Sequence, residues 1–150
     1  MPVVRVYADG VFDLFHHGHA RVLEQAKKLF EDVELIVGVH SDEVVHAMKG
    51  ATVTTYAERM ESLRHCRWVD QIVGDAPWRI DEAFIREHRI DRVAHDGEPY
   101  PSPGVDDLYE VPKSMGIFMS TERTPLISTS LLIQRILDNV ETYRERNAQR

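Results

Sequence analysis

The stretch YADGVFDLFHHGHARVLEQAKKLF, residues 7–30, starts with the pattern of a β-strand and ends with that of an amphipathic helix. Residues 3–8 predict the strand, and residues 19–30 predict a helix with one apolar face. The turn between them holds two glycines, two aspartates and three histidines within residues 9–19. A strand that passes through a turn into a helix is the first unit of an α/β fold. The apolar face of this helix consists of Val22, Leu23, Ala26, Leu29 and Phe30.

The rest of the chain repeats this alternation of strand and helix. The nearly continuous apolar run at residues 34–40 is typical of a strand buried on both faces. We therefore expect a single α/β domain, residues 1–150, with a doubly wound, five-stranded parallel sheet. Further strands are predicted at 69–74, 91–96 and 116–120, and helices at 41–48, 57–66, 81–88, 106–115 and 128–147. The last helix is expected to bury Leu131, Leu132, Ile133, Ile136, Leu137 and Val140.

Composition narrows the class of protein. The formal net charge of −7 lacks the excess of Lys and Arg that nucleic-acid binding requires, so no nucleic-acid partner is expected. Cys66 is the only cysteine, which excludes an intrachain disulfide and fits a reducing compartment, the cytoplasm or the nucleus. No run approaches the ~20 apolar residues that span a bilayer, and we expect no direct membrane contact by this segment.

Ligands of doubly wound sheets bind beyond the carboxyl ends of the strands, where the strand order reverses. The first such loop carries His16 and His19, which one helical turn places on the same face. Imidazole N–H groups at a helix N-terminus suit a phosphate ligand. A pair of surface histidines near a helix cap, or part of a metal site, are the alternatives that this spacing leaves open.

Other chemistry-bearing residues are ambiguous when they are taken singly. By composition, Lys49 is an ordinary solvated lysine, and the STS run at residues 128–130 is an ordinary helix N-cap. A lone aromatic residue is most often part of a core. Their interpretation depends on a wider pattern in the chain.

That pattern is a resemblance to a known family. HHGH, residues 16–19, matches the H-x-G-H signature of the nucleotidyltransferase superfamily. With IVGVHSDE, MKGATV, RWVDQIV, APW, VAHDGEPY and ERTPLISTS in the same order, the chain closely resembles the catalytic domain of the CTP:phosphocholine cytidylyltransferases. The resemblance covers residues 4–147 and implies a Rossmann-like fold.

The resemblance also implies a reaction. CTP and phosphocholine would give CDP-choline and pyrophosphate by in-line attack of the phosphocholine oxygen on the α-phosphorus of CTP. A phosphate monoester is already ionised near neutral pH, so the task of the protein is positioning and charge neutralisation. Mg²⁺ is expected to accompany CTP because it shields the triphosphate.

The resemblance assigns roles to three sets of residues. The expected catalytic residues are His16, His19, Lys49 and Arg123. The expected nucleotide-binding residues are Gly10, Val11, Phe12, Asp13, His16, His19, Arg59, Arg67, Ile127, Ser128, Thr129 and Ser130, with Asp13 also a candidate for the metal. The expected phosphocholine-binding residues are Asp9, Lys49, Trp78, His95, Asp96, Tyr100 and Tyr109, because aromatic faces and carboxylates hold a quaternary ammonium.

A subunit interface is implied as well. Arg59 and Arg67 are expected about two turns apart on the third predicted helix. In the resembling family the motif that starts at Arg67 belongs to a dimer interface, which predicts a homodimer through residues 67–71. Trp68 stands where a tyrosine is commoner in the family.

The loop at residues 123–130 departs from the family pattern. Pro125 and Leu126 stand where the family usually has glutamate and glycine, and leucine is poorly suited to the positive φ that glycine adopts. A catalytically impaired nucleotide-binding domain is therefore an alternative. A cytidylyltransferase for phosphoethanolamine or glycerol-3-phosphate, and an adenylyl-transferring relative, are the others.

Overall fold

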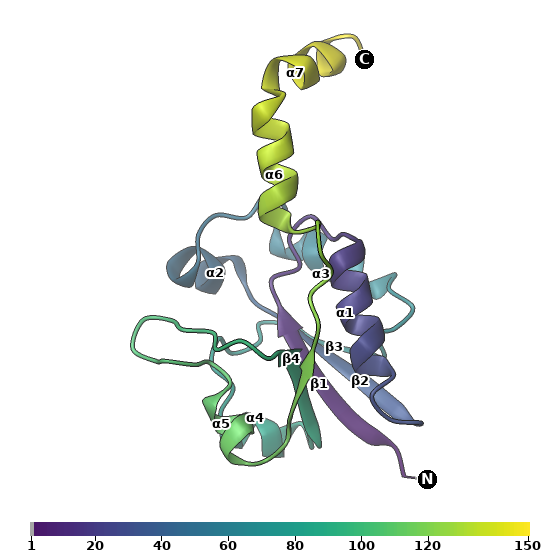
Figure 1. The fold of residues 1–150 in the computed structure, drawn as a ribbon, viewed down its shortest axis with the longest axis vertical. Coiled ribbons are helices and arrows are strands. Elements are labelled where there is room, and N and C mark those ends of the chain that lie inside the picture. The colour runs from purple at the N-terminus through teal and green to yellow at the C-terminus, as the bar shows by residue number, and fades with distance from the viewer. Residues whose placement is uncertain (1) are drawn as a thin grey trace.

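The computed structural model describes residues 2–150 and contains one five-stranded, all-parallel sheet with the strand order β3-β2-β1-β4-β5 (Figure 1). This arrangement confirms the predicted α/β, Rossmann-like fold. The strands are β1 (Val4–Gly10), β2 (Val33–Val39), β3 (Gln71–Val73), β4 (Arg92–Asp96) and β5 (Phe118–Thr121).

Helices cover both faces of this sheet (Figure 1). Buried residues of α1 and α3 belong to one hydrophobic cluster, and those of α4 and the segment leading into α5 belong to a second. The described chain contains α1 (His17–Lys27), α2 (Asp42–Met48), α3 (Tyr56–Arg64), α4 (Glu82–Glu87), α5 (Glu110–Ser114), α6 (Thr129–Asp138) and α7 (Val140–Ala148).

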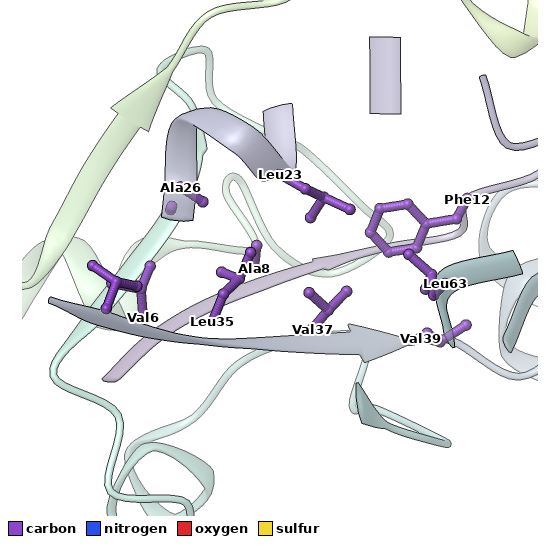
Figure 2. Packing of buried hydrophobic residues seen from close by; sticks show 11 residues of the cluster. Val6, Ala8, Phe12, Leu23, Ala26, Leu35, Val37, Val39 and Leu63 are labelled. Atoms are coloured by element: carbon purple, nitrogen blue, oxygen red, sulfur yellow. The ribbon is translucent and has the colours of Figure 1, made fainter. Parts of the chain in front are cut away.

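The cluster on the α1 face fixes the position of α1 against the sheet. Leu23 and Ala26 of α1 pack over Ala8 of β1 and Leu35 of β2, and all four side chains are fully or almost fully buried (Figure 2). Full burial of an aliphatic side chain such as Leu23 stabilises the fold by roughly 1.5–3 kcal/mol. The N-terminus of α1 is therefore held at the carboxyl end of β1.

On the other face, Tyr7 of β1 meets Phe84 of α4 edge to face, with ring centroids 5.0 Å apart. Tyr7 also explains a glycine in the neighbouring strand. A Cβ on Gly38 would lie 1.9 Å from the Tyr7 hydroxyl oxygen, so any larger residue there would displace the ring. The Tyr7 hydroxyl thus fills the space that a side chain at position 38 would need.

The strand order reverses between β1 and β4, which lie side by side in the sheet. The connections that follow β1 and β4 run in opposite directions along the sheet, and a crevice opens between them at such a switch point. The loops after β1, β4 and β5 meet at this edge, as the sequence predicts.

The predicted helix at residues 128–147 is wrong in two respects. It consists of α6 and α7, which are separated at Asn139 (φ −128°, ψ 30°). It also buries no residue fully, and Leu137 remains 58% exposed because α6 leaves the body of the domain (Figure 1). The apolar periodicity identified a face of the helix, but periodicity does not say what covers that face.

Two further elements are shorter than predicted. The expected helix at 106–115 is reduced to α5, in which Pro112 is tolerated because N–H groups in the first turn have no intrahelical acceptor. The expected strand at 69–74 is reduced to β3. No helix within residues 2–150 has the length and apolarity needed to cross a membrane.

Candidate active site

The two histidines of the H-x-G-H motif form the N-terminal cap of α1. The Nδ1 atom of His16 accepts a hydrogen bond from Gly18 N at 3.1 Å, and the Nδ1 atom of His19 accepts one from His16 N at 3.2 Å. An imidazole whose Nδ1 accepts carries its proton on Nε2 when it is neutral. The cap therefore leaves both rings with Nε2–H as the donor.

Burial keeps these rings neutral. The two imidazoles lie 3.7 Å apart between centroids and nearly parallel. Burial first, then the charges of His16 and Lys49, lower the pKa of His19 to about 3, although Asp13 acts in the other direction. Burial and the charge of His17 also lower the pKa of His16. The pair thus offers hydrogen-bond donors without mutual charge repulsion.

Gly18 gives the His16 ring its space. A Cβ on Gly18 would lie 2.9 Å from His16 Cε1 and 3.1 Å from Ile127 Cγ2. Thr129 approaches the same ring, with its hydroxyl oxygen 3.4 Å from His16 Nε2, and donates its own proton to the Asp13 carbonyl oxygen at 2.9 Å. The N-terminus of α6 is thereby joined to the β1–α1 loop.

The β1–α1 loop adopts a conformation that is uncommon for its residues. Phe12 and Leu14 have φ values of 60° and 51°, in the left-handed region that disfavours side chains with a Cβ. The ring of Phe12 is buried in the cluster beneath α1, which offsets this strain. Strained backbone of this kind is concentrated at functional sites.

Asp13 has a structural task in this loop. Its carboxylate accepts hydrogen bonds from Val53 N at 2.9 Å, Thr54 N at 2.8 Å and the Thr54 hydroxyl at 2.6 Å. Burial raises the pKa of Asp13, but these bonds and the charge of Arg59 lower it overall. Asp13 therefore clamps the segment that follows Lys49, and its oxygens are already engaged.

The described residues do not form a metal site of their own. Residues 2–150 contain no group of three or more His, Cys, Asp or Glu side chains arranged to hold a metal ion. The carboxylate proposed from the sequence, that of Asp13, accepts three hydrogen bonds from the 53–54 segment. Residues 2–150 therefore offer no cluster that would hold Mg²⁺ by protein ligands alone.

Two arginines expected at the nucleotide lie elsewhere. Arg59 is buried in α3 and donates to the Val11 carbonyl oxygen at 2.7 Å and to Asp42 at 2.9 Å, so it supports the β1–α1 loop from behind. Arg67 is exposed and lies beyond the end of α3. The expectation that Arg59 and Arg67 lie two turns apart on one helix is therefore wrong. Neither side chain lines the cavity described next.

A cavity of about 680 Å³ opens at the carboxyl edge of the sheet. Its wall brings together His16 and His19, the β1–α1 loop, and Lys49 at the C-terminus of α2. Arg123, which follows the carboxyl end of β5, is 75% exposed, donates to Asp96 at 3.1 Å and lines the same cavity. The predicted residues that line this cavity are Asp9, Gly10, Val11, Phe12, Asp13, His16, His19, Lys49, His95, Asp96, Tyr100, Arg123, Ile127, Ser128, Thr129 and Ser130.

The loop before α6, in which Pro125 and Leu126 depart from the family pattern, still lines this cavity. Leu126 takes φ = 67°, the conformation expected of the glycine in the family pattern, and its side chain is 87% exposed. Ser128 caps α6 by accepting from Leu131 N at 3.1 Å. The free N–H groups of this helix end therefore still face the cavity, and they favour anions.

A smaller cavity of about 100 Å³ adjoins the first. The rings of Trp78 and Tyr100 meet edge to face with centroids 6.1 Å apart, and His95 stacks on Tyr109 at 4.3 Å. Both cavities are lined by Asp9, Gly10, Val11, Lys49, His95 and Tyr100, so they form one connected site.

Asp9 supplies the negative charge of the small cavity. Its carboxylate accepts from the Tyr109 hydroxyl at 2.6 Å and lies 3.5 Å from His40 Nε2. Burial raises the pKa of Asp9, but the contacts with His40 and Tyr109 and the charge of His95 lower it overall, which keeps the carboxylate ionised. An ionised carboxylate among aromatic faces suits an alkylated cation.

Two contributors were missed in the sequence. His40, directly after β2, lines the small cavity. Gln25 of α1 holds the Glu122 peptide with two hydrogen bonds, 2.9 Å to its carbonyl oxygen and 2.8 Å from its N–H, just before Arg123. The position of His40 at a strand end was a usable signal, whereas nothing in the sequence distinguishes Gln25 from other helix residues.

The site thus combines donors for several phosphate oxygens with an aromatic and acidic pocket for a small cation. Together with the fold, it defines an α/β domain with a candidate site for a phosphate-bearing ligand. A family model described as Cytidylyltransferase-like matches residues 7–135, and the chain belongs to this family. The resemblance inferred from the motifs is confirmed at this level.

Individual relatives are more specific. The chain is 55% identical over 147 residues to choline-phosphate cytidylyltransferase A of Rattus norvegicus, covering 98% of this chain and 40% of the relative. It is 53% identical to choline-phosphate cytidylyltransferase of Saccharomyces cerevisiae, covering 96% of this chain and 34% of the relative. An ethanolamine-phosphate cytidylyltransferase of Arabidopsis thaliana is 39% identical, covering 97% of this chain and 35% of the relative. The chain therefore spans 34–40% of the length of these relatives.

A solved structure supports the fold. A lipopolysaccharide core biosynthesis protein of Thermoplasma volcanium superposes with a TM-score of 0.62 at 22% sequence identity, covering 81% of this chain and 98% of that chain.

Proposed function

We propose that this chain is the catalytic domain of a choline-phosphate cytidylyltransferase, which makes CDP-choline and pyrophosphate from CTP and phosphocholine. The observation that carries the proposal is the pair of connected cavities, one lined by phosphate donors and one by aromatic rings and Asp9, with Lys49 in the wall of both. The identity of 55% to a choline-phosphate enzyme, against 39% to an ethanolamine-phosphate enzyme, supports the choice of substrate.

The large cavity would bind the triphosphate. The Nε2–H groups of His16 and His19 and the N-terminus of α6 would donate to phosphate oxygens there. These donors are held in place by backbone hydrogen bonds before the substrate arrives. Preorganised donors stabilise negative charge that develops in a transition state, because they need no rearrangement at that moment.

The small cavity would bind the choline end. A trimethylammonium group has no N–H to donate, so it is held by aromatic faces and by the charge of a carboxylate. Trp78, Tyr100 and Tyr109 supply the faces, and Asp9 supplies the charge. This arrangement favours phosphocholine over phosphoethanolamine, whose ammonium group would leave its N–H donors poorly matched to ring faces.

In the proposed reaction, an ionised oxygen of phosphocholine attacks the α-phosphorus of CTP and forms a new P–O bond. The bond to the β-phosphate oxygen breaks, and its electron pair leaves with pyrophosphate. No proton needs to be removed from the nucleophile. Lys49, which lines both cavities, would place an ammonium group between the two repelling anions.

We propose that Mg²⁺ enters as part of the substrate, bound by the oxygens of CTP. This assignment fits the absence of a metal-ligand cluster within the described residues 2–150.

We also propose a homodimer through residues 67–71, since the exposed Arg67 and Gln71 leave this edge of the sheet accessible. A cytoplasmic location remains part of the proposal, with the nucleus as the alternative.

The test is a pyrophosphate-release assay with a panel of substrates. CTP with phosphocholine is expected to give the highest kcat/KM, well above CTP with phosphoethanolamine or glycerol-3-phosphate, and ATP is expected to be inactive. Preference for phosphoethanolamine would reject the aromatic pocket as a choline site. Binding of CTP without turnover of any acceptor would identify the chain as an impaired nucleotide-binding domain.

A further inference from the structure

His40 is a buried histidine of the small cavity that the proposed reaction does not use. It follows β2 directly and is 4% exposed. Its ring meets the indole of Trp78 edge to face, with centroids 4.9 Å apart, and its Nε2 atom lies 3.5 Å from a carboxylate oxygen of Asp9. His40 therefore contacts both an aromatic wall and the charged group of the pocket.

The hydrogen-bond geometry determines where the protons of His40 are. Its Nδ1 atom lies 3.0 Å from the carbonyl oxygen of Ala76, which can only accept, so Nδ1 must carry a proton. The Nε2 atom faces the ionised carboxylate of Asp9, and an unprotonated Nε2 would direct its lone pair at a negative charge. Both ring nitrogens therefore carry protons, and the empty pocket holds an imidazolium ion paired with Asp9.

The surrounding charges agree with this state. Burial and the charge of Arg59 from α3 disfavour the imidazolium, but the hydrogen bond and charge of Asp9 and the Ala76 carbonyl raise the pKa of His40 overall. Tyr109 donates to the other oxygen of Asp9 and leaves the oxygen near His40 available. His95 lines the same pocket from β4, and Lys49 lines it from the C-terminus of α2.

The imidazolium of His40 pairs with Asp9, the carboxylate that a bound choline group would also need as its counter-ion. A trimethylammonium group placed among Trp78, Tyr100 and Tyr109 would share the single Asp9 carboxylate with His40. Two cations beside one anion repel each other more strongly at a buried site, such as that of His40 and Asp9, than they do in water. A histidine can relieve this repulsion near neutral pH by losing a proton, whereas an arginine or a lysine cannot do so easily.

We propose that His40 is a positioning residue of the choline pocket, which holds Asp9 and Trp78 in place as an imidazolium and releases one proton to solvent when a quaternary ammonium group binds. The inference rests on the proposed function. On binding, the Nε2–H bond breaks, the proton passes to the buffer, and the lone pair stays on Nε2. The neutral ring keeps its Nδ1–H bond to Ala76, and the methylated cation then replaces the imidazolium as the partner of the Asp9 carboxylate.

Titration calorimetry with CDP-choline tests the proposal. Its diphosphate bridge has no group that titrates near neutral pH, so a proton released on binding comes from the protein. Measurements in two buffers of different ionisation enthalpy, PIPES and Bis-Tris, count the protons. We expect release of about one proton per CDP-choline at a pH between the bound and free pKa values of His40, where affinity rises up to about tenfold per pH unit.

CDP-glycerol is the matched control ligand, since it carries the same cytidine diphosphate without a cation. It is expected to bind without releasing a proton. Equal proton release from both ligands, or none from CDP-choline while it binds well, would overturn the inference and leave the proposed function standing. If CDP-choline bound no better than CDP-glycerol and phosphocholine were not turned over, both would fail together.

Variants assign the proton to one residue. His40→Asn keeps an N–H donor for the Ala76 carbonyl but cannot titrate, so proton release and the pH dependence of CDP-choline affinity are expected to disappear. His40→Gln serves the same purpose if the asparagine variant does not fold. His46→Asn, at an exposed position of α2, is the matched control and is expected to release the wild-type number of protons. Unchanged release in a folded His40 variant would contradict the proposal.

Discussion

His16 and His19 lie face to face at the start of α1, with their ring centroids 3.7 Å apart, and each Nδ1 atom accepts a backbone N–H. The motif is therefore a helix cap made of two imidazoles. The cap fixes one tautomer for both rings and directs two N–H donors away from the backbone. The H-x-G-H motif therefore has a structural role beside its proposed chemical role, because its two histidines determine where α1 begins.

Removal of one of these donors should reduce turnover. His16→Ala is expected to lower kcat about 10²–10³-fold, the usual effect of losing one preorganised donor to a developing charge. The pyrophosphate-release assay measures this change. His17→Ala is the matched control, because His17 is exposed in the same turn, and it should stay close to wild type. Equal losses in the two variants would show that the Nε2–H donor of His16 is not the cause.

The low pKa of His19 predicts acid sensitivity. Its pKa falls to about 3 in the folded chain from an ordinary value near 6.5, so the unfolded chain binds the extra proton between these values. Stability should therefore fall as the pH drops below 6.5, by up to about 1.4 kcal/mol per pH unit from this group. His40 acts in the opposite sense, since its raised pKa gives stability that is lost as the pH rises through the folded value.

Urea unfolding at several pH values, from neutral to mildly acidic, separates these groups. The free energy of unfolding of His19→Asn should depend less steeply on pH than that of wild type. A variant slope equal to the wild-type slope would show that His19 is not protonated on unfolding in this range.

Gly18→Ala should damage the site without unfolding the chain. Alanine is normally the better helix residue, by about 1 kcal/mol, so the helix itself gains. The new Cβ would lie 2.9 Å from His16 and 3.1 Å from Ile127, which forces the His16 ring to move. We expect thermal stability within a few degrees of wild type and a kcat reduced as in His16→Ala. Full activity would show that the ring position is not required.

Leu126→Gly should stabilise the protein. Leucine at φ = 67° carries a strain of about 1–2 kcal/mol, part of which is offset by the greater freedom of glycine in the unfolded chain. We expect the free energy of unfolding to rise by about 0.5–1 kcal/mol, measured in urea. Leu126→Ala removes the exposed side chain but keeps the strain, so it should give no such gain. An equal rise in the free energy of unfolding in both variants would show that the exposed leucine side chain, and not the backbone strain, lowers the stability of the wild type.

Lys49→Ala should lower kcat by orders of magnitude while leaving the fold intact, because Lys49 is exposed at the end of α2 and lines both cavities. The comparison is Lys28→Ala, an exposed lysine of the surface pair with Glu24. Activity measured with saturating CTP and phosphocholine distinguishes the two. A nearly active Lys49→Ala enzyme would remove this lysine from the mechanism.

Sequence patterns predicted the sheet well because buried parallel strands leave long apolar runs, such as residues 34–40, between helices with one apolar face. Asp9 and His16 after β1, and Trp78 after β3, line the two connected cavities as expected, since the carboxyl ends of neighbouring parallel strands lie at one edge of the sheet. Lys49, at the end of α2, lines both cavities. These features follow from local periodicity and from topology, which a single sequence contains.

Features that depend on tertiary contacts were not predictable in this way. Arg59 was expected at the nucleotide, yet α3 turns it inward to the Val11 carbonyl oxygen. Asp13 reads as a ligand for a cation, yet its oxygens bind a loop 40 residues further along the chain. The apolar face of α6 was recognised, but its exposure depends on where the chain directs the helix after Ser128. His40 was overlooked because no local pattern shows that Asp9 and Ala76 enclose it.

The most direct test of the account is a crystal structure of the protein with CDP-choline. The account predicts a trimethylammonium group between Trp78 and Tyr100, beside Asp9, and a diphosphate within hydrogen-bond distance of the Nε2 atoms of His16 and His19. A choline group outside the small cavity, or a diphosphate bound away from the two histidines, would contradict it.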